Sequence, residues 1–212
     1  MTKGVFITIE GPDGSGKTSV MELLKIYLYE KNIEYIATRE PGGINISEQI
    51  RNVILDKENI AMDSRTEALL YAASRRQHMA ERVIPALKNG KMVICDRFID
   101  SSLAYQGYAR GIGIDEVMNI NEFAIDGYMP DLTLYLDIEP EIGLERICKN
   151  KQREVNRLDL EKLDFHKKVR EGYYILLEKY PNRIKKINAN KPIQIVFDEI
   201  TKILSKKIGI DS

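Results

Sequence analysis

The sequence predicts an α/β fold in which a five-stranded parallel sheet is covered by helices on both faces. Two observations point to it. Short apolar runs rich in β-branched and aromatic residues alternate with longer segments whose apolar residues have helical spacing. Several of these runs also end in glycine or charged residues, as expected where the carboxyl ends of parallel strands meet in one crevice. No linker-like composition divides the 212 residues, so we expect a single domain over 1–212.

The strands are predicted from apolar runs that are too short to be helices. The first is followed by a glycine-rich loop, and the second by Arg39–Gly43, where one proline and two glycines forbid a regular element. The third ends at the charged pair Asp96 and Arg97, and Pro130 precedes the fourth. In chain order the predicted strands are Val5–Ile9, Ile33–Thr38, Met92–Cys95, Leu132–Asp137 and Ile184–Ile187.

Helices are predicted between and after these strands. Ser64 and Glu67 fit a capping box that opens the longest helix, and Pro85 is expected to kink or interrupt that helix. In chain order the predicted helices cover residues 19–28, 46–55, 65–89, 99–108, 114–126, 140–148, a segment with Phe165, Val169, Tyr173 and Leu176 on one face, and 193–208. Residues 149–157 carry almost no apolar side chain, so we expect a mobile lid over about 149–158.

The composition excludes several classes of protein. Lys plus Arg and Asp plus Glu both number 32, so no overall basic field favours nucleic acid or an anionic membrane as the partner. No apolar stretch is long enough to span a bilayer and no signal sequence is seen, so a cytoplasmic protein is expected. Cys95 and Cys148 lack metal-ligand spacing and are interpreted as buried free thiols. His78 and His166 are predicted to be surface residues rather than catalytic ones.

The glycine-rich loop after the first strand matches a Walker A phosphate-binding loop at every defined position. Its glycines allow positive φ angles, and its N–H groups together with the helix N-terminus would bind an anion. Lys17 would reach the outer phosphates of ATP, and the Thr18 hydroxyl would ligate Mg²⁺. The predicted ATP-binding residues are Gly11, Pro12, Asp13, Gly14, Ser15, Gly16, Lys17 and Thr18. The alternative is a glycine turn that binds no nucleotide.

A second charged group lies at the end of the third predicted strand. Asp96 has the position of a second Mg²⁺ partner, and Arg97 beside it offers a planar donor pair for a phosphate that the Walker loop does not hold. The alternative is a simple Asp-Arg pair in a turn. The Walker loop, Arg39–Gly43 and Asp96–Phe98 are expected to face one crevice.

Two helical faces could bind a planar base. Tyr71 and Arg75 are four residues apart, so their ring and guanidinium share a face. Ser102, Tyr105 and Gln106 share another, and the glutamine amide can both donate and accept hydrogen bonds. Each group alone is weak, because tyrosine at helical spacing is more often a core residue and paired arginines more often form a solvated face.

The predicted lid contributes two arginines. Phosphoryl transfer is accelerated mainly by positive charge on the transferring oxygens, and a cationic lid would also exclude water. The variable positions of the Walker loop hold Asp13 and Ser15 instead of arginine, so Arg153 and Arg157 are the candidate catalytic cations. The alternative is a charged surface loop.

Together these residues resemble the bacterial thymidylate kinase family, over essentially the whole chain. The resemblance is carried by the Walker loop, by Thr38-Arg39-Glu40-Pro41-Gly42-Gly43, by Tyr71-Ala72-Ala73-Ser74-Arg75-Arg76 and by the run from Asp96 to Gly107. It implies a P-loop NTPase fold, a Mg²⁺ cofactor and transfer of the ATP γ-phosphoryl group to dTMP, giving dTDP and ADP for dTTP synthesis. It also implies a homodimer.

The resemblance further implies roles for individual residues. Arg39 and Arg97 would bind the dTMP phosphate with Arg51 and Glu40 nearby, and Tyr71 would stack on thymine where the family usually has phenylalanine. The implied contacts to the base are Arg75 and Gln106, with Ser102 lining the pocket, Tyr105 against the sugar 2′ position and Asp13 at the 3′-hydroxyl. Lys17, Asp96, Arg97, Arg153 and Arg157 would form the catalytic set.

Two other functions remain open at this point. One is a kinase for another nucleoside monophosphate or for a deoxynucleoside. The other is a GTP-binding switch, which would need an Asn-Lys-x-Asp guanine reader. The one similar string, Asn190-Lys191-Pro192-Ile193, lacks the final aspartate, which disfavours the switch.

Overall fold

The computed structural model describes residues 4–149 and 156–209. Five strands form one sheet in the order β2-β3-β1-β4-β5, and every neighbouring pair is parallel. The strands are β1 Phe6–Glu10, β2 Tyr35–Arg39, β3 Met92–Asp96, β4 Leu132–Asp137 and β5 Ile184–Asn188. Each lies within two residues of its predicted range, and the predicted five-stranded parallel sheet is confirmed.

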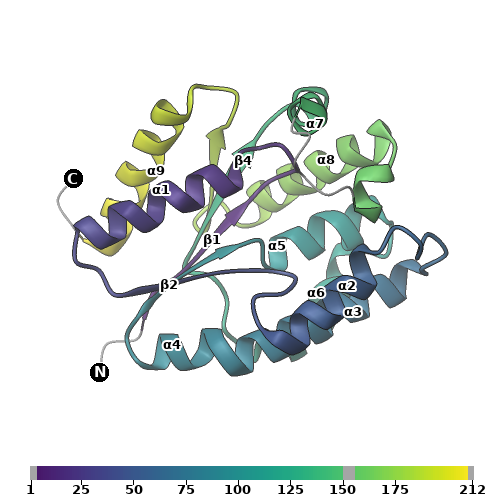
Figure 1. Cartoon of the computed structure of the whole chain (residues 1–212), viewed down its shortest axis with the longest axis horizontal. Helices are drawn as coiled ribbons and strands as arrows, with labels where there is room; N and C mark the ends of the chain where they lie inside the picture. The colour runs from purple at the N-terminus through teal and green to yellow at the C-terminus, as the bar shows by residue number, and fades with distance from the viewer. Residues whose placement is uncertain (1–3, 150–155, 210–212) are drawn as a thin grey trace.

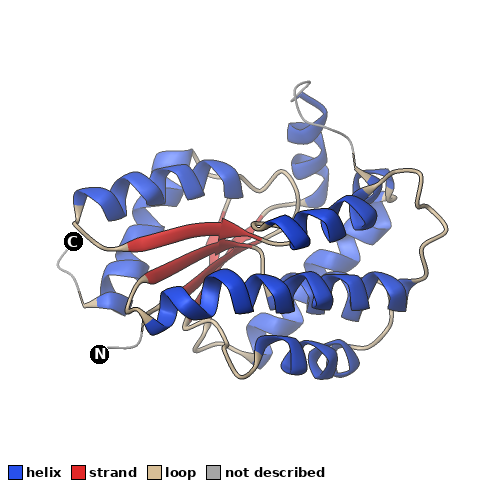
Figure 2. Cartoon of the chain, turned by 60° about the horizontal axis from the view of Figure 1, so that its bottom comes forward, coloured by secondary structure: helices blue, strands red, loops and turns tan. Residues whose placement is uncertain are grey.

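Helices cover both faces of the sheet (Figures 1 and 2). The helices are α1 Lys17–Glu30, α2 Asn45–Leu55, α3 Ser64–His78, α4 Ile84–Lys88, α5 Ile99–Ser102, α6 Ile114–Ile125, α7 Pro140–Lys149, α8 Leu163–Lys179 and α9 Ile193–Ile208. Three short turns complete the list, the π-helical η1 Met79–Val83 and η2 Leu103–Ala109 and the 3₁₀-helical η3 Arg157–Leu160. Within the described ranges, no helix is long and apolar enough to cross a membrane.

The alternation of side chains along β1 divides the core into two layers. Ile7 and Ile9 face a layer that includes Leu24 of α1 and Ile200 of α9. Phe6 faces the opposite layer, which is built from η1, α4, α5, η2, α6 and α8. Because successive side chains of a strand point to opposite faces, five consecutive buried residues in β1 require a helix layer on each side.

The long helix predicted over 65–89 is interrupted before Pro85. Proline cannot donate the backbone hydrogen bond that an α-helix needs, and the π-helical turn η1 precedes it. The helix also begins differently from the prediction, because Asp63 and not Ser64 caps it by accepting from the backbone N–H groups of Arg65 and Thr66. The capping-box interpretation of Glu67 is therefore wrong.

The predicted surroundings of three other residues also need correction. His78 and His166 are both buried, at 0% and 3% exposure. Cys95 is buried as predicted, but Cys148 is exposed. Both cysteines are free thiols.

Candidate functional site

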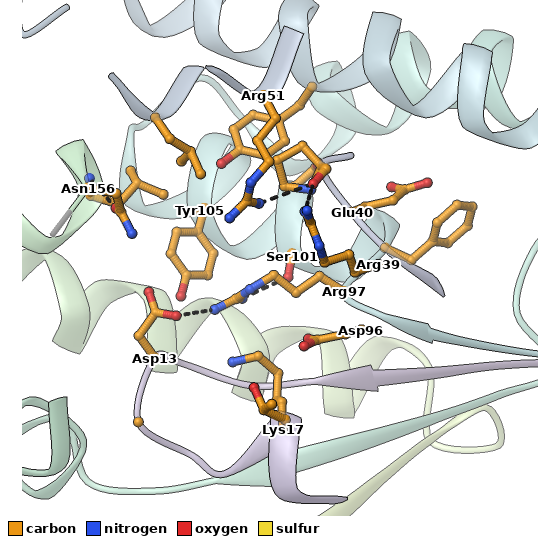
Figure 3. Close-up of a pocket in the computed structure, with 18 of the residues that line it drawn as sticks. Asp13, Lys17, Arg39, Glu40, Arg51, Asp96, Arg97, Ser101, Tyr105 and Asn156 are labelled. Atoms are coloured by element: carbon orange, nitrogen blue, oxygen red, sulfur yellow. Dashed lines mark hydrogen bonds and ion pairs between the residues drawn. The ribbon is translucent and has the colours of Figure 1, made fainter. Parts of the chain in front are cut away.

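One cavity of about 510 Å³ opens at the carboxyl ends of β1, β2 and β3. It collects residues that are far apart in the sequence, as Figure 3 shows for a labelled subset. Of the residues proposed above, the cavity is lined by Asp13, Gly14, Gly16, Lys17, Thr18, Arg39, Glu40, Arg51, Tyr71, Arg75, Asp96, Arg97, Ser102, Tyr105 and Gln106. Arg153 lies outside the described residues, and the predicted site residues that do not line the cavity are Gly11, Pro12, Ser15 and Arg157.

The Walker loop joins β1 to α1 and contributes its backbone to this cavity. Gly16 precedes the first turn of α1 with a φ of 91°, a left-handed conformation that favours glycine. At Gly14, a Cβ atom would lie 2.2 Å from the carbonyl oxygen of Gly143, so no larger residue fits there without a shift of the backbone. The N-terminus of α1 therefore faces the cavity with its N–H groups available to an anion.

Lys17 is the first residue of α1 and is held by the Walker loop. Its Nζ donates to the carbonyl oxygens of Gly11 and Pro12, at 3.0 Å each. Burial, with a further contribution from the positive charge of Arg97, lowers the pKa of Lys17 to about 8. An anion in the cavity would oppose both effects and favour the charged amine.

Asp96 is the last residue of β3, the strand that neighbours β1 in the sheet. Its Oδ1 is buried and, among the described residues, has no hydrogen-bond partner. An unpartnered buried carboxylate oxygen is costly unless a cation or donor joins it. Thr18 lines the same cavity, and hydroxyl and carboxylate oxygens are the ligands that Mg²⁺ prefers. These two residues therefore fit a magnesium site, although the described residues hold no group of three or more His, Cys, Asp or Glu side chains that could bind a metal alone.

Three guanidinium groups converge above Lys17 and Asp96 (Figure 3). Arg39 and Arg51 both donate to the carbonyl oxygen of Pro41, at 2.7 and 3.1 Å. Arg97 donates to Asp13 Oδ1 at 2.8 Å and to Ser101 Oγ at 3.1 Å. Burial and the neighbouring charge of Arg39 lower the pKa of Arg51. Such a cluster of cations is typical of a phosphate site.

The loop between β2 and α2 positions two of these arginines. Its Glu40–Pro41 peptide bond is cis. Glu48 of α2 accepts from Arg39 Nη2 and from the backbone N–H of Gly43, both at 2.7 Å. The loop is therefore held against the first turn of α2, with the Pro41 carbonyl facing Arg39 and Arg51.

Arg75 of α3 also lines the cavity and is only 1% exposed. Its Nε donates to Glu40 Oε2 at 2.7 Å, and its Nη1 donates to Ser102 Oγ and to Asn121 Oδ1. The other oxygen of Glu40 is 2.9 Å from His78 Nδ1, so Glu40 supports Arg75 from behind. These contacts fix the plane of the guanidinium before any ligand binds.

Tyr105 and Gln106 reach the cavity from the π-helical turn η2, which directly follows α5. The guanidinium of Arg97 lies 5.2 Å from the centre of the Tyr105 ring. Gln106 Nε2 donates to Glu67 Oε1 at 2.8 Å. π-Helical turns are rare and occur often at functional sites, because the wider turn redirects side chains.

Arg157 is directed away from the Walker loop in this structure. It is 6% exposed, its Nη2 lies 2.5 Å from Glu67 Oε2, and its Nε donates to the carbonyl oxygen of Ile54. These contacts join Arg157, which the sequence places near the end of the mobile lid, to α3 and to the end of α2. The structure thus brings Lys17, Asp96 and Arg97 together but not Arg157.

Sequence reasoning missed three side chains that support the site. Arg146 of α7 lines the cavity and contacts the carbonyl oxygens of Gly14 and Ala189, and no sequence signal singled it out. Glu67 and His78 did carry a signal, because positions 67, 71, 75 and 78 share one face of α3. That face is the one that carries Tyr71 and Arg75.

Glu10, the last residue of β1, is a further buried support. It accepts from the backbone N–H of Phe98 at 2.7 Å, from Ser101 Oγ at 2.6 Å and from the Tyr173 hydroxyl at 2.8 Å. Two of these contacts fix Phe98 and Ser101, which follow Arg97 in the chain. Burial, together with the negative charge of Asp100, raises the pKa of Glu10 to about 7, while hydrogen bonds from Ser101 and Tyr173 and the charge of Arg97 oppose the shift.

We expect Glu10→Gln to flatten the pH dependence of stability. Since the pKa of Glu10 is raised on folding, its favourable contribution is complete below pH 4.5 and is lost as the pH rises through about 7. Between pH 4.5 and 8, the free energy of unfolding of the native protein should therefore fall by about 3 kcal/mol more than that of the glutamine variant. Urea unfolding at several pH values measures this, with Glu30→Gln on the exposed face of α1 as the control. If the free energies of unfolding of Glu10→Gln and of the native protein changed with pH in parallel, the raised pKa of Glu10 would be contradicted.

Comparisons with known proteins agree with this geometry. The family model described as thymidylate kinase matches residues 9–200. A thymidylate kinase from Clostridium novyi (strain NT) is 80% identical over 200 residues, which cover 94% of this chain and 98% of that protein. One from Anoxybacillus flavithermus is 60% identical over 204 residues, covering 96% and 98% of the two chains. The crystal structure of thymidylate kinase from Ehrlichia chaffeensis is similar with a TM-score of 0.78, at 36% identity and over 95% of this chain and 99% of the other.

Proposed function

This chain belongs to the thymidylate kinase family and transfers the γ-phosphoryl group of ATP to dTMP, giving dTDP and ADP, and from this premise we propose how its residues carry the reaction. The observation that supports the proposal best is the shared cavity. Residues of the Walker loop, the three arginines Arg39, Arg51 and Arg97, and the pair Arg75 and Gln106 all line it.

The donor site is the Walker loop. Gly11, Pro12, Asp13, Gly14, Ser15 and Gly16 would hold the ATP phosphates through their backbone, and Lys17 would move from the loop carbonyls to the outer phosphate oxygens. Thr18 and Asp96 would hold Mg²⁺, which when bound supplies positive charge to the phosphate oxygens. The unpartnered Oδ1 of Asp96 supports this choice.

The acceptor site begins at the three arginines. Arg39, Arg51 and Arg97 would bind the dTMP phosphate and orient one of its oxygens toward the γ-phosphorus of ATP. A phosphate monoester is largely dianionic at pH 7, so its oxygen can attack without a general base. The oxygen forms the new P–O bond as the bond to the β-phosphate oxygen of ADP breaks, and Lys17 and Arg97 stabilise the charge on the transferring group.

The nucleoside part of dTMP would extend from these arginines toward Arg75 and Gln106. Tyr71 would stack on the base, Arg75 and Gln106 would contact its edge, and Ser102 would line the pocket. Tyr105 would lie against the sugar and Asp13 near its 3′-hydroxyl. Glu40 contributes through Arg75, since both its oxygens are already bonded to Arg75 and His78.

The two arginines of the predicted lid have different roles in this proposal. Arg153, outside the described residues, remains the candidate cation for the transferring phosphoryl group. Arg157 remains a candidate only if it leaves Glu67, with which it forms a buried ion pair here.

A panel of phosphoryl acceptors tests the substrate. Phosphoryl transfer from ATP to dTMP, dUMP, UMP, CMP and thymidine should give the highest kcat/KM for dTMP. A higher value for UMP, CMP or a nucleoside would favour the alternative, a kinase for another nucleoside monophosphate or a deoxynucleoside.

We also propose that the protein forms a homodimer through α2, α3 and α6. These helices lie side by side on one flank of the molecule (Figure 1) and expose four large apolar side chains, Ile46, Val53, Leu69 and Phe123. Phe123 is 88% exposed. Apolar groups gathered on adjacent helices are typical of a contact with another protein surface, and a second copy of the same face would cover them.

Phe123→Asp is expected to convert the dimer into a monomer. A charge at the centre of an apolar contact would have to lose its water without gaining a partner. Sedimentation velocity should give twice the single-chain mass for the native protein and the single-chain mass for the variant. Tyr29→Asp is the matched control, because Tyr29 is 79% exposed on α1, away from this flank. A native protein that sediments as a monomer would refute the proposal.

A further inference from the structure

Glu67 is a buried carboxylate whose position the helix start does not explain. It lies in the first turn of α3 and is 1% exposed, but Asp63 caps that helix. Burying a carboxylate is costly unless it is paired and hydrogen-bonded. The structure supplies such partners on three sides.

The partners of Glu67 come from two segments, η2 with the residue that follows it and η3. Arg157 Nη2 lies 2.5 Å from its Oε2, Arg110 Nη2 lies 3.2 Å from the same oxygen, and Gln106 Nε2 donates to its Oε1 at 2.8 Å. Burial alone would raise the pKa of Glu67, but Arg110, the Gln106 hydrogen bond and Arg157 together lower it below its usual value. The side chain is therefore an ionised carboxylate at neutral pH.

An ionised carboxylate fixes which end of the Gln106 amide can face it. The carboxylate has only acceptor oxygens, and the amide has one donor end and one acceptor end. Only the NH₂ group can therefore lie against Glu67. Gln106 lines the cavity, so with its NH₂ group against Glu67 it offers a ligand there its acceptor, Oε1, beside the second hydrogen of that NH₂ group.

Arg75 offers the complementary group. A guanidinium has donors only, and Glu40, Ser102 and Asn121 hold this one in place in the same cavity. A donor beside an acceptor matches a pyrimidine with a carbonyl oxygen at position 4 and an N–H at position 3. A cytosine ring has the reverse pattern, an amino group and an unprotonated nitrogen.

We propose that Glu67 is a positioning residue for base specificity, because it holds Gln106 in the amide orientation that accepts from the N3–H of thymine and rejects cytosine. The inference rests on the proposed function, in which Arg75 and Gln106 contact the base edge. Glu67 would thus affect which nucleotide base is accepted but would take no part in phosphoryl transfer.

Glu67→Gln tests the inference directly. A glutamine at 67 can either accept from or donate to Gln106, so both amide orientations become accessible. The two substrates are dTMP and 5-methyl-dCMP, which share the methyl group, sugar and phosphate and differ only at the ring edge. The ratio of kcat/KM for dTMP to that for 5-methyl-dCMP should fall about tenfold or more in the variant, while KM for ATP stays unchanged.

Glu161→Gln is the matched control. Glu161 Oε1 lies 2.6 Å from Arg110 Nη1, so this variant also removes a carboxylate from Arg110, but Glu161 has no contact with Gln106 among the described residues. It should leave the ratio unchanged. A second check compares the single variant Gln106→Met with the double variant Gln106→Met and Glu67→Gln. If Glu67 acts through Gln106, these two variants should have the same ratio of kcat/KM values.

The outcomes separate the inference from the proposed function. If the native enzyme shows no preference for dTMP over 5-methyl-dCMP, the proposed base site fails. If the native enzyme prefers dTMP strongly and Glu67→Gln keeps the same ratio, the inference alone is overturned. Glu67→Asp carries the same test if the glutamine variant does not fold, since it keeps the charge that pairs with Arg110 and Arg157 but shortens the reach toward Gln106.

Discussion

Replacing Lys17 with alanine is expected to lower kcat for dTMP phosphorylation by about a thousandfold or more. Phosphoryl transfer needs little covalent chemistry from the protein, so catalysis depends on positioning and on positive charge near the transferring group. Lys17 begins α1, and its Nζ lies at the Walker loop carbonyls beside the cavity. Steady-state rates with saturating ATP and dTMP measure the effect.

The control for this variant is Lys25→Ala on the same helix. Lys25 pairs with Glu22 on a partly exposed surface and does not line the main cavity. Its removal should change kcat less than twofold, and circular dichroism should show both variants folded. Near-normal turnover of Lys17→Ala would remove the Walker loop from the mechanism as proposed.

The strands could be predicted from the sequence because their signal is local. Runs such as Phe6–Glu10 and Leu132–Asp137 are buried on both faces, so they contain almost uninterrupted apolar or β-branched residues. The order of the strands carries no such signal. It depends on contacts between β1 and two strands more than 80 residues away, Met92–Asp96 and Leu132–Asp137, which periodicity does not encode.

The candidate site was predictable where charged or glycine residues follow a strand. The Walker loop, Arg39 and Arg97 are of this kind, and the parallel sheet places them at one edge. The supporting side chains were harder to predict. His78 was assigned to the surface because its neighbours in the sequence are polar, but it lies on the buried face of α3 and contacts Glu40 and Thr38.

Glu67 shows the same difficulty in another form. Its spacing from Ser64 fits a capping box, so the sequence alone offers a local explanation for a carboxylate near a helix start. The actual partners are Gln106, Arg110 and Arg157, which are 39 to 90 residues away in the sequence. A buried charge is explained only when such distant partners are known.

Arg75→Ala has the second large expected effect, and it should separate the two nucleotide sites. The guanidinium is buried, is held by Glu40 and Ser102, and lines the cavity. If Arg75 donates to the base as we propose, its removal should raise KM for dTMP about 100-fold, since hydrogen bonds to charged groups are worth about 1.5–3 kcal/mol. KM for ATP should change little.

The same substitution should also destabilise the fold, which makes the choice of control important. Without Arg75, His78 is the one side chain among the described residues that still pairs with the buried carboxylate of Glu40, and breaking a buried ion pair costs about 3–5 kcal/mol. Arg75→Lys keeps a positive charge near Glu40 but loses the planar donor pair, so its stability should recover more than its dTMP affinity. Arg76→Ala, on the exposed neighbour, should change neither. If Arg75→Ala weakened ATP and dTMP equally, the loss would reflect general damage to the cavity, and the base site would have to be placed elsewhere.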